Sequence, residues 1–182
     1  MTLRIDVAAL LAEAGIVDVD VDEAVADEHV RSSAYGRVVS VTASSRSCDR
    51  DGAIVATILR DPIEVVSKAA VVDLVDRIAR KAIGPAEFRQ WSAGLLPETD
   101  RLHPGNSEFI RRRIHDWVFC LSVNDGHVPS PGELAEVTRW MQRLLAQEST
   151  SPPVLALLAE SGVTRKVRNI AKNRAVSHNA RQ

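Results

Sequence analysis

The residues best suited to chemistry in this sequence are basic, and most of them lie near its C-terminal end. From residue 164 to residue 182 the chain carries six Lys or Arg residues and no acidic residue. Guanidinium and ammonium groups on one helix bind phosphate oxygens, and an Asn beside them can contact a base edge. A solvated basic face that binds nothing is the alternative. The predicted contacts to nucleic acid or another partner are Arg165, Lys166, Arg168, Asn169, Lys172 and Arg174.

A second basic group consists of the consecutive residues Arg111, Arg112 and Arg113, within an apolar stretch that we predict to be helical. Successive helical residues are about 100° apart around the axis, so the three side chains fan across the solvent face of the helix. They could hold phosphate. They could also surround a core helix with their aliphatic stems and pair with nearby glutamates. The sequence leaves both interpretations open.

No residue pattern in the chain is typical of catalysis or of metal binding. The sequence contains no P-loop, no nucleophile elbow and no GxGxxG motif. Cys48 and Cys120 are far apart and match no metal-ligand spacing. The histidines place no two candidate ligands one helical turn apart; they are His29, His103, His115, His127 and His178. We therefore expect a protein that is not an enzyme and that holds no cofactor or metal.

Charge is unevenly distributed along the 182 residues, although the formal net charge is only −1. Between Asp6 and Glu28 there are eight acidic residues and no Lys or Arg. An acidic N-terminal and a basic C-terminal part can mark a partner-binding arm, or simply two solvated surfaces. No signal-peptide pattern and no apolar run of membrane-spanning length is visible, and there are two cysteines. These features predict a reduced, cytoplasmic protein without a membrane partner.

The elements that would position these side chains are helices with a recurring start signal. In 61–64, 84–87 and 130–133 a residue suited to the N-cap precedes Pro, and Glu follows two residues after the Pro. Pro tolerates the first helical position, and Glu meets the unpaired amides there. The segments 106–108 and 151–153 are looser versions. The starts recur about every 23 residues, half of a two-helix repeat of about 40–47 residues.

The fold prediction is a mainly α protein, with an antiparallel helical stack or bundle over residues 50–176. Residues 1–49 are expected to form a less regular acidic segment, with short helices at 5–14 and 22–33, a strand at 35–42 and a connecting loop at 43–51. Residues 177–182 are expected to form a flexible tail. Apolar residues at helical spacing predict helices at 62–82, 85–96, 107–123, 131–147, 154–161 and 164–175. Val65, Val66 and Ala69 are expected on the buried side of the first of these.

Residues 58–70 and 157–173 resemble HEAT-like and leucine-rich-variant helical repeats. In these families a leucine-rich helix leads through an Asp-Pro or similar turn to Val-Arg and a small residue in the second helix. The C-terminal copy has Val167-Arg168 and Ala171, whereas the first copy has Ser67 where Arg is usual. The resemblance implies a curved helical stack that binds partners on one face, and it implies no enzymatic activity.

The same C-terminal pair, 154–175, is also similar to a helix-turn-helix with a basic second helix. Val167 falls one residue early for the usual buried position in that motif. The leading functional hypothesis is therefore a non-catalytic helical interaction or regulatory protein that binds a macromolecular partner, with a protein as the favoured partner. The alternative is a DNA-binding regulator that uses the basic pair. The sequence does not set the oligomeric state.

Overall fold

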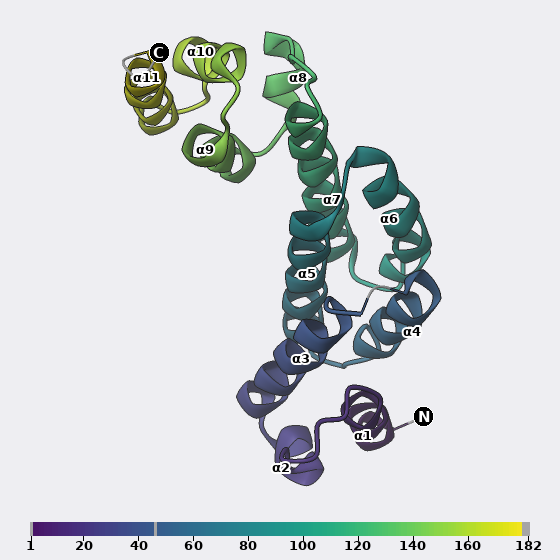
Figure 1. Cartoon of the computed structure of the whole chain (residues 1–182). Coiled ribbons are helices and arrows are strands. Elements are labelled where there is room, and N and C mark those ends of the chain that lie inside the picture. The colour runs from purple at the N-terminus through teal and green to yellow at the C-terminus, as the bar shows by residue number, and fades with distance from the viewer. Residues whose placement is uncertain (1, 46, 180–182) are drawn as a thin grey trace. The chain divides into compact units, whose positions relative to one another are not determined.

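The regular elements are all α-helices in the computed structural model, which describes residues 2–45 and 47–179 (Figure 1). The prediction of a mainly α protein is confirmed. The helices are α1 (Leu3–Glu13), α2 (Val21–Ala26), α3 (Glu28–Thr42), α4 (Cys48–Ile58), α5 (Glu64–Lys81), α6 (Pro85–Thr99), α7 (Pro104–Asn124), α8 (Pro131–Glu136), α9 (Arg139–Glu148), α10 (Pro152–Ser161) and α11 (Arg165–Asn179).

The chain divides into two compact units. Unit 1 contains the described residues up to 82 together with 87–113, and unit 2 contains residues 83–86 and those from 114 onward. Helix α7 therefore contributes its first half to unit 1 and its second half to unit 2. Of the tail expected at 177–182, residues 177–179 continue α11, and 180–182 lie outside the described residues.

The N-terminal part of unit 1 contains the helices α1, α2 and α3, joined by short irregular connections. The strand expected at 35–42 is the second half of α3, whose first turn is capped by the Asp27 carboxylate, which accepts from the His29 amide at 2.7 Å. Tyr35, Val38 and Val39 are buried on one side of this helix. The β-branched residues favour a strand by propensity, but burial at helical spacing against α5 outweighs that preference.

Helix α5 fills the centre of unit 1, packed against α3 and α4. Its buried residues include Val66, Ala70, Val71 and Leu74, whereas Val65 is 66% exposed. Ala69 is exposed as well, so two residues expected inward face outward. Apolar residues occur on more than one side of this helix, so the contacts with other helices decide which side is buried. The helix also begins at Glu64, two residues later than Pro62.

A buried ion pair ties three elements of unit 1 together. Arg31 Nε donates to Asp61 Oδ2 at 2.6 Å, and the side chains are 2% and 0% exposed. Arg31 Nη1 also donates to the carbonyls of Ala24 and Val25 at the end of α2, at 2.9 and 3.1 Å. The guanidinium thus joins α2, α3 and the turn before α5. The Tyr35 hydroxyl donates to the same Asp61 oxygen at 2.9 Å.

A capping box starts helix α8 in unit 2. Ser130 Oγ accepts from the Glu133 amide at 3.2 Å, and the Ser130 amide donates to Glu133 Oε2 at 2.8 Å. The helix start at Pro131 is therefore as predicted. The Ser130 amide and the Ser130 hydroxyl both donate to Glu133 Oε2, the hydroxyl at 2.9 Å, and these two hydrogen bonds hold the pKa of Glu133 below its usual range.

The single helix expected at 131–147 is wrong, because α8 and α9 are separate. Between them the Thr138 amide donates to Asp116 Oδ1 at 2.9 Å, and the Thr138 hydroxyl also donates to this buried carboxylate. The Thr138 hydroxyl oxygen in turn accepts from the Met141 amide at 3.3 Å as the N-cap of α9. An acceptor supplied by α7 thus interrupts the helix, and the local sequence gives no sign of it.

Helices α9, α10 and α11 form a three-helix group (Figure 1). The α9 side chain Gln142 accepts from the Val163 amide at 2.8 Å, just before α11, and the Ala146 carbonyl accepts from Arg174 at 3.4 Å near the end of α11. Helices α9 and α11 therefore run side by side in the same direction, with α10 antiparallel. The buried side chains at their centre include Met141, Leu145, Val154, Leu155, Leu158, Val167 and Ala171.

Among the described residues, no helix combines the length and the apolar character needed to cross a membrane.

Candidate nucleic-acid interface

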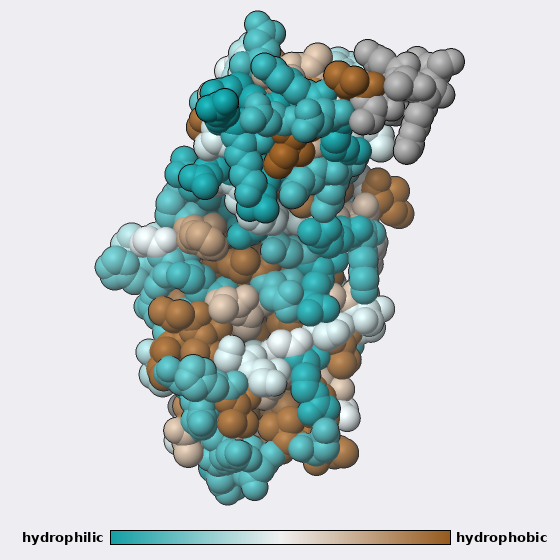
Figure 2. Space-filling model, turned by 90° about the vertical axis from the view of Figure 1, so that its left-hand side faces the viewer, coloured by the Kyte–Doolittle hydropathy of each residue, from teal (hydrophilic) through white to brown (hydrophobic). Residues whose placement is uncertain are grey.

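One side of α11 is an exposed strip without acidic residues. Arg165, Asn169 and Lys172 are spaced i, i+4 and i+7, so they share one face of the helix, and Lys166 flanks them. All four side chains are exposed. On the opposite side Val167 and Ala171 are buried in the three-helix group. We call these four exposed residues the α11 strip. Figure 2 shows the surface around α11, at the top of the view, as mostly hydrophilic.

The start of α11 is fixed by its connection to α10. Gly162 ends α10, and the Thr164 hydroxyl accepts from the Val167 amide at 3.2 Å. The side chain Gln142 holds the Val163 amide between them. Because the turn is short and hydrogen-bonded, the exposed strip sits on a helix with a defined position within unit 2.

Two of the predicted contact residues have another task in the structure. Arg168 Nη1 donates to the Gly162 carbonyl at 2.6 Å, and Arg174 Nη1 donates to the Ala146 carbonyl at 3.4 Å. Both side chains are half-buried. They hold α11 against the end of α10 and against α9. The sequence alone had predicted both arginines as partner contacts.

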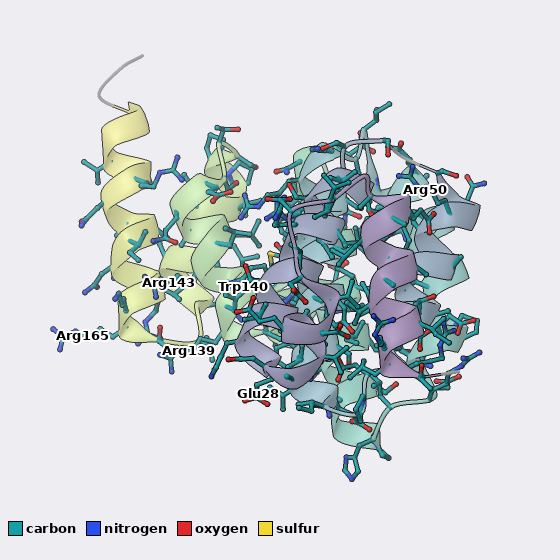
Figure 3. All side chains as sticks on the ribbon, turned by 90° about the horizontal axis from the view of Figure 1, so that it is seen from below. Glu28, Arg50, Arg139, Trp140, Arg143 and Arg165 are labelled. Atoms are coloured by element: carbon teal, nitrogen blue, oxygen red, sulfur yellow. The ribbon has the colours of Figure 1, made fainter. Side chains whose placement is uncertain are left out.

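Two exposed arginines that sequence reasoning missed lie on α9. Arg139 and Arg165 occupy neighbouring ends of α9 and α11, and Arg143 follows one turn further along α9 (Figure 3). From residue 139 to residue 179 the chain carries seven basic and two acidic residues. The i, i+4 spacing of Arg139 and Arg143, opposite the apolar phase of α9, was the signal that could have found them.

The consecutive arginines of α7 lie in unit 1 beside acidic side chains. Arg111 pairs with Asp100, Arg112 with Glu108 at 3.8 Å, and Arg113 with Asp76 at 3.6 Å. Arg113 has a side-chain exposure of only 14%, so the expectation that all three lie on the solvent face is wrong. The arrangement corresponds to the pairing alternative rather than to an exposed phosphate cradle.

The part of the chain that the structure describes contains no group of three or more His, Cys, Asp or Glu side chains placed to hold a metal ion. The fold and the α11 strip define a mainly α-helical protein with a basic helical surface. No family model, curated protein or solved structure matches the chain.

Proposed function

We propose that this chain is a non-catalytic helical binding protein whose unit 2 contacts the phosphate backbone of nucleic acid through the α11 strip. The observation that carries the proposal is the exposed, acid-free face of Arg165, Lys166, Asn169 and Lys172 on a helix docked against α9 and α10. A short turn between two packed helices, with the second helix exposed and basic, is the arrangement that helix-turn-helix proteins use in the major groove.

The chemistry of the strip suits this role. Each Lys or Arg that neutralises a phosphate releases condensed counterions, so several cations on one face produce strong, salt-dependent binding. Asn169 lies between Arg165 and Lys172 on the same face, where its amide can contact a base edge once the cations have positioned the helix. Arg139 and Arg143 add positive charge on the parallel helix α9.

The triple variant Arg165→Ala, Lys166→Ala, Lys172→Ala tests the proposal. We expect its affinity for a random-sequence DNA duplex at low salt to fall at least about tenfold. The slope of log affinity against log salt should decrease in magnitude by about 2–3, because up to three phosphate contacts are lost. Fluorescence anisotropy over a salt series measures both quantities.

The matched control removes three exposed arginines from unit 1, by Arg77→Ala, Arg89→Ala and Arg101→Ala. It changes the net charge by the same amount and should keep most of the affinity and slope. Equal losses of affinity in both variants would mean that binding depends on the net charge of the protein and not on the α11 strip. Binding that does not depend on salt would contradict a phosphate contact outright.

A protein partner is a second candidate, favoured by an exposed aromatic ring in unit 1. Phe109 is 46% exposed, with Lys68 Nζ at 5.2 Å and the Arg113 guanidinium carbon at 5.7 Å from its ring centroid. Val65, one turn before Lys68 on α5, is also exposed. Aromatic side chains that emerge from a charged surface are enriched among the residues that dominate protein–protein affinity.

The variant Phe109→Ala tests this candidate. A protein partner that binds this surface should lose about tenfold or more in affinity, since truncation of such an anchor commonly costs more than 1 kcal/mol. The measurement is quantitative capture from nuclease-treated lysate, followed by titration of the captured protein. Val163→Ala, which removes an exposed apolar residue from unit 2, is the control. Equal retention by both variants would reject the Phe109 surface.

A further inference from the structure

Unit 1 contains a pocket of about 160 Å³ between α4, the end of α5 and α6. Its walls include Asp51, Ile78, Ala82, Glu87, Phe88 and Trp91. A cavity of about 150 Å³ is large enough for a benzene-sized ligand. The pocket is separate from the α11 strip, which belongs to unit 2.

The most unusual group in this pocket is the carboxylate of Asp51. This residue is only 1% exposed. Asp51 Oδ2 accepts from the Trp91 indole Nε1 at 3.1 Å. Asp51 Oδ1 is buried and has no hydrogen-bond partner among the described residues. A buried acceptor without a donor is costly, and such groups in native proteins commonly await a water, an ion or a ligand.

The electrostatic balance around Asp51 leaves room for a positive charge. Burial raises the pKa of the Asp51 carboxyl group. The Trp91 hydrogen bond, the charge of Arg50 and the Ser47 amide act in the opposite direction but are the smaller influences. A bound cation that donates to Oδ1 would replace the solvation that the carboxylate has lost.

The remaining walls favour a hydrocarbon chain next to that charge. Phe88 and Trp91 are stacked, with ring centroids 5.6 Å apart and an interplanar angle of 27°. Ile78 and Ala82 add aliphatic surface. Aromatic faces attract cations, and the Glu87 carboxylate at the pocket wall disfavours anionic ligands.

We propose that this pocket binds a small primary alkylammonium group, whose N–H donates to Asp51 Oδ1 while its hydrocarbon chain packs against Phe88 and Trp91. A free amine and the side chain of a lysine in a partner protein both supply this chemistry. The pocket volume admits either, since both present a short methylene chain that ends in an ammonium group.

The experiment follows the indole N–H signal of Trp91 by NMR while n-butylammonium chloride is added to the full-length protein. Trp91→Phe assigns the signal. We expect a saturable shift with a Kd on the order of 1 mM, which is reasonable for so small a ligand. 1-Butanol, of the same size but without charge, should bind at least about tenfold more weakly.

Asp51→Asn keeps the size of the side chain and an acceptor for Trp91 but removes the negative charge, and it should weaken n-butylammonium binding at least about tenfold. Asp73→Asn, on the exposed side of α5, is the control and should leave binding unchanged. Should Asp51→Asn fail to fold by circular dichroism, Glu87→Gln takes its place, with a weakening of a few-fold expected. An absent or non-saturable shift, equal binding of 1-butanol, or equal binding by a folded Asp51 variant would overturn the proposal.

A second titration separates the two sources of the ammonium group. Nα-acetyl-lysine methylamide carries the lysine side chain with its backbone flanks, whereas n-butylammonium carries the chain alone. Tighter binding of the lysine derivative assigns the pocket to a lysine of a partner protein. Tighter binding of n-butylammonium assigns it to a free amine.

Discussion

Replacing Asp61 by alanine is expected to lower the free energy of unfolding of unit 1 by about 3–5 kcal/mol. The Asp61 carboxylate accepts from Arg31 Nε at 2.6 Å, from the Tyr35 hydroxyl at 2.9 Å and from the Ile63 amide at 2.8 Å. The Arg31 side chain is 2% exposed, so the substitution leaves a buried guanidinium without the carboxylate that it pairs with. That loss is far larger than the net value of the ion pair itself, because removal of one partner strands the other.

Chemical denaturation followed through the tryptophan indole signals measures the effect separately in each unit. Trp91 reports on unit 1, whereas Trp117 and Trp140 report on unit 2. Asp73→Ala breaks an exposed pair with Arg77 and should cost no more than about 0.5 kcal/mol.

The double variant Arg31→Met, Asp61→Leu removes both charges and should be more stable than Asp61→Ala alone. If Asp61→Ala were as mild as Asp73→Ala, the buried pair would not be a determinant of the fold. If the double variant were the less stable of the two, the stranded charge would not be the cause of the loss.

The helix starts were the part of the fold most accessible from sequence. Helices α6 and α8 begin at Pro85 and Pro131 as predicted, because Pro at the first helical position depends on local chemistry alone, and α10 begins at Pro152, two residues before the predicted start at 154. The errors arose where a distant residue decides. Asp116 separates α8 from α9 through Thr138, and Arg31 together with Tyr35 binds Asp61 Oδ2, while Asp61 Oδ1 accepts from the Ile63 amide before α5 begins at Glu64.

The candidate sites divide in the same way. The basic face of α11 could be predicted because its charges are close in sequence and helical spacing places them together. The hydrogen bonds that Arg168 and Arg174 donate to backbone carbonyls depend on the positions of α10 and α9, so they could not be predicted in this way. The alkylammonium pocket depends on Asp51 and Trp91, which are 40 residues apart, so no local pattern could reveal it.

The resemblance to helical repeats stays a prediction. The structure does give Arg31 and Arg168 a shared role, since each follows a Val early in its helix and binds carbonyls at the end of the preceding helix.

The contact between α10 and α11 provides the second large effect, through Gly162→Ala. A Cβ atom at this position would lie 2.5 Å from the Leu158 carbonyl oxygen and 2.8 Å from Val167 Cγ1. The φ angle of Gly162 is −58°, so alanine meets no backbone strain, and the penalty comes from the Leu158 carbonyl at the end of α10 and from Val167 of α11. Since the nearest atom belongs to the backbone and cannot rotate away, we expect unit 2 to lose about 3 kcal/mol or more.

Gly94→Ala in α6 is the matched control, because a Cβ there meets nothing within 4 Å. It should stabilise the protein by about 0.5–1 kcal/mol, since alanine is the better helix former. The two variants differ only in where one methyl group is added. The Trp117 and Trp140 signals should therefore report early unfolding in Gly162→Ala while the Trp91 signal changes little, and equal stability of the two variants would contradict the packing argument.

The same variant also separates the position of α11 from its charge. Gly162→Ala retains every basic residue of the α11 strip but displaces the helix that carries them. If nucleic acid is bound by a defined helical face, this variant should lose affinity under conditions where unit 2 is still folded, as judged by Trp117 and Trp140. If affinity is retained while the triple charge variant loses it, the cations act as a flexible basic segment, and a docked recognition helix is ruled out.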